Sequence, residues 1–199
     1  MGKPSTAPPG VDIALVAVFA ALLAALSLTP QIPVGAIGIP LTLQTLGVLL
    51  AGLVLGPWRG FLAVSLYLAV GLAGLPVFAG ATGGLAVFGK PSIGFLLSFP
   101  LAAAVVGALA AFLLRRGTRW QYLWLTLAGL VTSLVVIYPL GILGMMVVGR
   151  IDLLTAIGIN LAFIPGDIVK SFAAAAIAIA VHKAFPALLV AGRPALDLR

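Results

Sequence analysis

Charged residues are so sparse along this chain that they leave five long apolar intervals between them. The intervals are residues 13–58, 60–89, 91–114, 120–149 and 153–182. Only the last interval contains any charge, at Asp167 and Lys170. A helix needs about 20 apolar residues to cross the hydrocarbon core of a bilayer. Every interval is therefore long enough for at least one transmembrane helix.

Prolines divide the first of these intervals. Because proline both ends and begins helices, Pro30, Pro33 and Pro40 split residues 13–58 into two spans. The whole pattern then predicts six transmembrane helices. We expect them over residues 11–29, 40–56, 58–74, 92–115, 120–148 and 164–184.

Two stretches do not have the pattern of a membrane span. Residues 71–91 contain six glycines and two prolines. Residues 149–166 begin with the charged residues Arg150 and Asp152 and end with Pro165-Gly166. Backbone of this kind is tolerated at membrane depth only where protein or a water-filled cavity covers it. With six helices, both stretches are expected on the same side of the membrane.

Composition agrees with the hydropathy pattern. The chain is 63% apolar by residue type and only 8% charged, whereas a soluble domain has roughly 25% charged residues. A disordered chain would be poor in apolar residues and rich in charge. The sequence therefore predicts an all-α integral membrane protein and excludes soluble and disordered classes.

The basic residues indicate how the helices are oriented. Cytoplasmic loops of membrane proteins carry an excess of lysine and arginine, and here one side carries eight basic residues and the other only Lys90 and Arg150. The eight are Lys3, Arg59, Arg115, Arg116, Arg119, Lys183, Arg193 and Arg199. We therefore expect a multi-pass protein of the cell membrane with cytoplasmic tails at 1–10 and 185–199 around a membrane domain at 11–184. The net charge of +7 belongs to these loops, so nucleic acid is not an expected partner.

Two alternatives to this assignment concern the beginning of the chain and its chemistry. The apolar run within residues 1–27 is long enough to span, which favours a helix over a cleaved signal peptide.

The chain has no cysteine, one histidine and no glutamate, which leaves little for metal binding or acid–base catalysis. We expect neither an enzyme nor a bound cofactor or metal.

The densest group of polar residues in an apolar setting lies between Asn160 and Lys170. Pro165 suits the first turn of a helix, which would place Asp167 near the positive end of the helix dipole. Lys170 follows three residues later, on the same helix face. Ionisable groups at this depth should face the bundle interior, paired with each other or touching a ligand. The alternative is an ion pair that only stabilises the helix.

Other polar residues are expected at the same side of the membrane. Lys90 lies in the glycine-rich stretch, Gln44 lies at the start of the second span, and Tyr138 lies in the fifth. Within apolar helices such groups seek partners inside the bundle. Gln44 could therefore contact another helix rather than a ligand. Tyr138, which precedes Pro139, could simply lie at a helix kink.

The first span carries alanines at Ala17, Ala21 and Ala25, spaced four residues apart. Small residues at this spacing allow a second helix to approach closely in lipid. The stripe predicts either a docking face for a partner subunit or packing within the chain.

Three motifs together resemble the BioY family, the biotin-binding S-components of energy-coupling factor transporters. They are TLQTLGVLLAGLVLGPWRG at 42–60 followed by Tyr67, GLAGLPVFAGATGG at 71–84, and NLAFIPGDIVK at 160–170. The resemblance implies a six-helix protein that captures biotin from outside and delivers it by toppling against a transmembrane T-component. The resemblance also implies that two ABC-type ATPases drive this step. No GxxxxGK[ST] motif occurs in this chain, so any ATP hydrolysis must belong to a partner. The resemblance also implies that the alanine stripe docks onto the T-component.

The same resemblance suggests how biotin would be held. Asp167 would accept hydrogen bonds from the ureido N–H groups, Asn160 would both donate and accept, and Lys170, with Lys90, would pair with the carboxylate. The other expected ligand-binding residues are Gln44, Tyr138, Phe78, Phe163, Gly83 and Gly84. The alternatives are an S-component or stand-alone carrier for another small vitamin-like carboxylate, and a structural membrane subunit.

Overall fold

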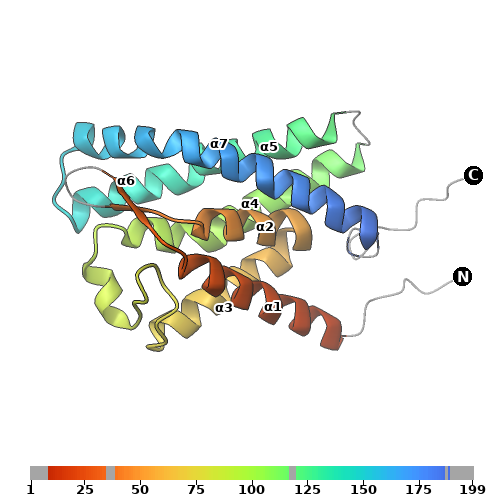
Figure 1. Ribbon diagram of the computed structural model, residues 1–199, viewed down its shortest axis with the longest axis horizontal. Helices are drawn as coiled ribbons and strands as arrows, with labels where there is room; N and C mark the ends of the chain where they lie inside the picture. Colours follow the sequence, from red (N-terminus) through yellow and green to blue (C-terminus); the bar gives the residue numbers. More distant parts are fainter. Residues whose placement is uncertain (1–8, 35–38, 117–119, 187, 189–199) are drawn as a thin grey trace, which may run out of the picture.

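The computed structural model describes residues 9–34, 39–116, 120–186 and 188, and within them it is almost entirely helical. Its helices form six rods, and most of them run roughly parallel or antiparallel to one another (Figure 1). They are α1 (Pro9–Ser27), α2 (Gln44–Leu55), α3 (Pro57–Leu72), α4 (Ile93–Arg115), the continuous rod α5 (Gln121–Thr132), η2 (Ser133–Ile137) and α6 (Tyr138–Val147), and α7 (Leu153–Ala184). The prediction of an all-α membrane protein with six helices is confirmed.

The two ends of the bundle differ. The start of α1 and the end of α7 lie at one end, which we call the terminal end (Figure 1). The opposite end, the loop end, carries the antiparallel hairpin of β1 (Ile32–Val34) and β2 (Ile39–Leu41), the 3-10 helix η1 (Leu85–Gly89) and the α6–α7 connection. The predicted tails fall largely on residues 1–8 and 189–199, which lie outside the described residues.

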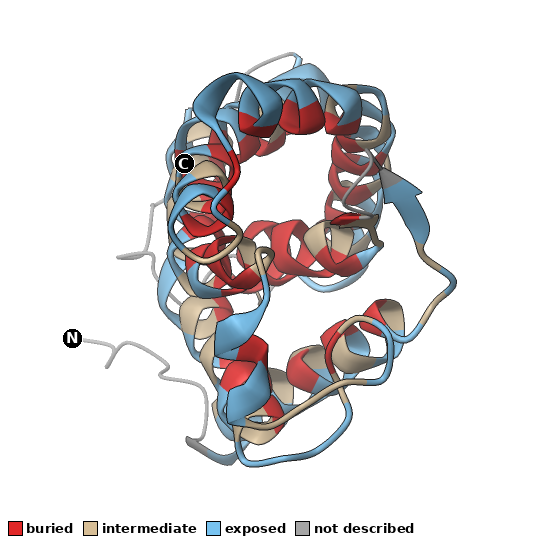
Figure 2. Ribbon diagram, turned by 90° about the vertical axis from the view of Figure 1, so that its left-hand side faces the viewer, coloured by how far each residue is buried: buried red, intermediate tan, exposed pale blue. Residues whose placement is uncertain are grey.

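Helix lengths distinguish two kinds of span. Four stretches within the described residues are long and apolar enough to cross a membrane, namely 10–27, 93–115, 121–147 and 153–184. In contrast, α2 has 12 residues, which corresponds to about 18 Å and is less than the roughly 30 Å hydrocarbon core. Ten of those 12 residues are buried, so protein rather than lipid surrounds α2. Viewed from the loop end, the buried residues of the rods face inward (Figure 2).

Glycines allow several helices to approach closely. A Cβ atom on Gly94 of α4 would collide with the Leu140 carbonyl and lie 2.9 Å from the Gly144 nitrogen of α6. At Gly107 of α4 it would lie 2.6 Å from the carbonyl carbon of Gly56. Backbone atoms cannot move aside as side chains do, so these contacts fix the distance of α4 from its neighbours.

We predict that Gly94→Ala lowers the free energy of unfolding by about 1 kcal/mol or more, because overpacking of a tight contact is destabilising. Gly158→Ala is the matched control, since nothing lies within 4 Å of a Cβ at this helical, exposed position. Thermal unfolding of the detergent-purified variants checks this. Equal melting temperatures for the two variants would contradict it.

The start of α7 differs most from the sequence prediction. Residues 149–166 were expected to lack a regular span, with Pro165 in the first turn of a helix. Instead the helix begins at Leu153, where the Asp152 carboxylate accepts a hydrogen bond from the Thr155 N–H at 3.0 Å. Pro165 therefore lies inside α7, and Asp167 is not in its first turn, so the predicted stabilisation by the helix dipole is wrong. Neighbouring helices make such an interior proline tolerable in a membrane.

The second span also begins later than predicted. Residues 39–41 form β2, and α2 begins at Gln44. Pro40 pairs across the hairpin with Pro33, so this proline belongs to a strand and the helix begins only after it. The predicted third, fourth and fifth spans agree with α3, α4 and the α5–α6 rod to within two residues at each end.

Candidate functional site

A cavity lies at the loop end between the hairpin, the segment 78–92 and the helices α2, α4, α6 and α7. Its wall is mostly apolar with a few polar groups, a composition that is typical of small-molecule sites. Seven of the predicted site residues line this cavity. They are Gln44, Phe78, Lys90, Tyr138, Phe163, Asp167 and Lys170.

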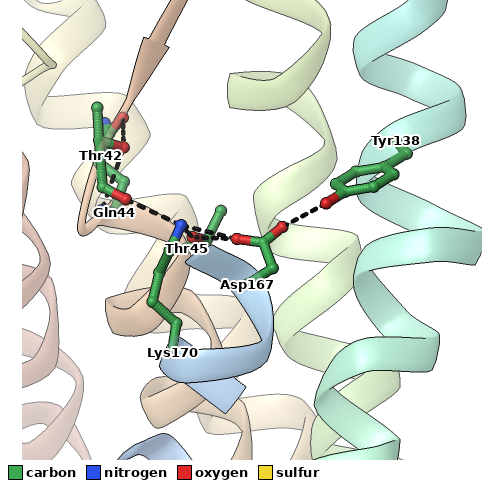
Figure 3. Close-up of polar contacts among 6 residues, drawn as sticks. All are labelled: Thr42, Gln44, Thr45, Tyr138, Asp167 and Lys170. Carbon is green, nitrogen blue, oxygen red and sulfur yellow. Dashed lines mark hydrogen bonds and ion pairs between the residues drawn. The ribbon is translucent and has the colours of Figure 1, made fainter. Parts of the chain in front are cut away.

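An ion pair lies in the cavity wall (Figure 3). The Lys170 Nζ atom is 2.7 Å from Asp167 Oδ1, and the two side chains are only 7% and 5% exposed. The hydroxyl of Tyr138 donates to Asp167 Oδ2 at 2.8 Å. The predicted i, i+3 relation of the two charges on one face of α7 is confirmed. A buried pair whose atoms also bond to neutral partners is well placed to contact a ligand.

A π-helical turn precedes Tyr138. Residues Ser133–Ile137 form this turn, and the Tyr138 N–H donates to the Ser133 carbonyl, five residues back. Pro139 follows, and a proline has no N–H for the regular α-helical bond. Such bulges are frequent at functional sites. Here the bulge ends at the residue whose hydroxyl bonds Asp167.

Lys170 has no free donor toward the cavity. Its ammonium group carries three N–H donors, and three acceptors surround it: Asp167 Oδ1, Thr45 Oγ1 at 2.7 Å and the Thr42 carbonyl at 3.1 Å. The bond to Thr42 ties α7 to the segment between the hairpin and α2 (Figure 3). Lys90, in contrast, is exposed while it lines the same cavity.

Gln44 also uses its amide within the protein. Its Nε2 atom donates to the Tyr67 hydroxyl at 2.6 Å, and its Oε1 atom accepts from the Thr42 hydroxyl at 3.2 Å. Gln44 therefore connects two helices and also lines the cavity. Both of the roles considered for it describe the structure.

Three of the predicted site residues do not form part of the cavity wall. Asn160 is buried, donates from Nδ2 to the Ala156 carbonyl at 2.8 Å, and leaves Oδ1 without a partner. Gly83 lies where a Cβ would collide with the Leu75 carbonyl. Gly84 has a φ of +75° and donates its N–H to the Gly71 carbonyl at 2.7 Å. The two glycines shape the loop that carries Phe78.

The apolar walls include residues that were not among the predicted site residues. Phe95 of α4 packs edge-on against Phe163, with ring centroids 5.9 Å apart, and Phe99 and Ile137 also line the cavity. Nothing in the local sequence of Phe99 and Ile137 separates them from other apolar helix residues. Thr45 was not among the predicted site residues, yet it contacts both charges of the ion pair.

The alanine stripe lies on the outside of the bundle. Ala17, Ala21 and Ala25 are all exposed, whereas Ala20 and Leu23 of the same helix are buried. The stripe therefore does not pack within the described part of the chain.

Comparison with known proteins connects this architecture to one family. The BioY family model matches residues 4–187. The chain is 40% identical to the biotin transporter BioY of Rhizobium etli, over 89% of this chain and 96% of that protein. It is 41% identical to the biotin transporter BioY of Rhodobacter capsulatus, over 90% and 97% of the two chains.

A solved structure is similar over nearly the same extent. The crystal structure of the S-component for biotin from an ECF-type ABC transporter superposes with a TM-score of 0.81 at 29% identity, covering 92% of this chain and 95% of that one. The family match at residues 4–187 spans all six helical rods, and the resemblance carried by the three sequence motifs is confirmed. The chain belongs to the BioY family.

Proposed function

We propose that this protein is the biotin-binding S-component of an energy-coupling factor transporter and that it takes biotin into the cavity at the loop end. The observation that carries the proposal is the buried Asp167–Lys170 pair in the wall of a mostly apolar cavity, in a member of the BioY family. The loop end faces outward, because the basic residues at the end of α4 and of α7 are at the terminal end.

The two ends of biotin suit different parts of this cavity. The ureido ring is flat and neutral, with two N–H donors and one carbonyl acceptor. Its desolvation costs little free energy if these groups form hydrogen bonds with the protein. It goes toward Asp167 and Tyr138, whose oxygens keep unused lone pairs in the described contacts. The carboxylate is costly to bury and stays at the mouth beside exposed Lys90. Phe78 and Phe163 cover the thiolane ring and its chain.

This assignment revises one role expected from the sequence. Lys170 was the first candidate for the biotin carboxylate, with Lys90 as an addition. Because the three donors of Lys170 already have acceptors, an incoming carboxylate would have to displace one of them. Lys170 instead orients the Asp167 side chain toward the ureido ring.

Transport against a gradient needs an energy source from outside this chain. No phosphate-binding GxxxxGK[ST] motif occurs in the sequence, so the ATPases are separate subunits. A transmembrane T-component connects them to this protein through the alanine stripe on α1.

Biotin binding by the purified protein tests the proposal. A ligand that binds only the folded state raises its thermal stability, so biotin should raise the melting temperature in a saturable manner. Lipoate is the matched control ligand, since it has the same pentanoate chain and a sulfur-containing ring but no ureido group. Stabilisation by lipoate and not by biotin would reject the proposal, and so would stabilisation by neither.

Docking of the partner can be tested separately. We predict that Ala21→Trp weakens co-purification with the T-component, because a bulky side chain prevents close contact between helices. Biotin binding by the isolated protein should be unchanged. Ala108→Trp, at an exposed position of α4, is the control and should co-purify normally. Equal recovery of the T-component with both variants would show that the stripe is not the docking face.

A further inference from the structure

One backbone carbonyl connects the end of α1 to the wall of the cavity. The Val77 carbonyl lies in the segment between α3 and η1 and receives two side-chain hydroxyls, one from Ser27 and one from Tyr67. Neither hydroxyl is near Val77 in sequence, being 50 and 10 residues away. The segment is thus attached to α1 and α3 at the same atom.

Ser27 is the last residue of α1 and is fully buried. Its hydroxyl lies within hydrogen-bonding reach of two carbonyls, Val77 and, at 2.7 Å, Ala24 of its own helix. A serine at a helix end commonly bonds its own backbone. The second acceptor is what distinguishes Ser27, because it lies on another element.

Tyr67 of α3 reaches the same carbonyl from the other side. Tyr67 is only 1% exposed. Its hydroxyl donates to the Val77 carbonyl at 3.1 Å and accepts from the Gln44 amide at 2.6 Å. Gln44 lines the cavity and bonds the Thr42 hydroxyl, and the Thr42 carbonyl accepts from Lys170. A continuous polar chain therefore leads from the end of α1 to the ion pair.

The residue after Val77 is Phe78, whose ring forms part of the cavity wall. The ring packs edge-on against Tyr67, with centroids 5.4 Å apart, and fills the space left by the missing side chain of Gly71. Phe78 also pairs with Thr82 through two backbone hydrogen bonds. Because Val77 and Phe78 are adjacent, holding the Val77 carbonyl in place also fixes the position of the Phe78 ring in the cavity wall.

We propose that Ser27 and Tyr67 are positioning residues for biotin, which hold the Val77 carbonyl and thereby keep Phe78 against the bound ligand. The proposal rests on the proposed function, because it assumes that biotin occupies this cavity. Neither Ser27 nor Tyr67 lines the cavity. Since Ser27 ends the helix whose outer face carries the alanine stripe, any displacement of α1 on docking reaches the cavity through this carbonyl.

Hydroxyl deletions test this inference. Ser27→Ala removes one donor and should increase the biotin dissociation rate about threefold to tenfold, the effect of one net hydrogen bond, with little change in the association rate. Tyr67→Phe removes the other and also leaves the Gln44 amide without its acceptor. In the double variant the carbonyl loses both donors, so its dissociation rate should exceed the product of the two single effects. Thr126→Val is the control, because that buried hydroxyl bonds only its own helix.

Hydrogen exchange separates positioning from general loosening. In Ser27→Ala, amides of residues 77–84 should exchange faster while those of α4 and α7 keep their wild-type protection. Faster exchange throughout the protein would mean that the hydroxyl only stabilises the fold, and the inference would be wrong. Wild-type dissociation rates in the double variant would also overturn it. If wild-type protein does not bind biotin at all, it is the proposed function that fails.

Discussion

Replacing Lys170 with alanine is expected to abolish detectable biotin binding and to lower the free energy of unfolding by about 3–5 kcal/mol. This is the cost of leaving one buried charge without its partner. Asp167 is 5% exposed, and without Lys170 its remaining donors are the hydroxyl of Tyr138 and the more distant one of Thr45. Thermal unfolding and biotin titration of the purified variant measure the two effects.

A charge-neutral double variant shows whether the pair also serves the ligand. Asp167→Asn combined with Lys170→Met leaves no charge unpaired and keeps the volumes similar, so stability should return to near the wild-type value. Biotin binding should stay lost, because the ureido N–H groups no longer meet a carboxylate. Recovery of wild-type affinity in the double variant would instead show that the ion pair is only structural.

Apolar length and proline position predicted the six helical rods, and they predicted the bounds of α3, α4 and the α5–α6 rod to within two residues. The proline signal was misleading at the start of α7. Pro165 is a strong signal for a helix start in water, yet in a membrane bundle the helix continues through it from Leu153. The local signal that would have corrected this is Asp152 three residues before Thr155, a helix N-cap arrangement.

Individual roles in the site depend on distances that no sequence pattern encodes. The spacing of Asp167 and Lys170 predicted that they share a helix face, and they do. That Lys170 is already surrounded by three acceptors depends on Thr42 and Thr45, more than 120 residues away in the chain. Asn160 is on the same helix as the ion pair but bonds its own backbone. Sequence therefore identified which residues are polar at this depth, and packing decided what each one contacts.

Lys90 is expected to determine the preference of the protein for a free carboxylate. Wild-type protein should bind biotin roughly tenfold more tightly than neutral biotin amide, a difference of about 1.4 kcal/mol, and the difference should shrink at high salt because Lys90 is exposed. Lys90→Gln should remove this preference by weakening biotin while leaving the amide almost unchanged. Arg150→Gln is the matched control, since it removes an exposed charge from the loop end but not from the cavity wall. Competition of both ligands against labelled biotin gives the four affinities needed. If Lys90→Gln keeps the wild-type preference, the carboxylate does not lie at the mouth, and biotin binds with its ends reversed from the arrangement proposed here.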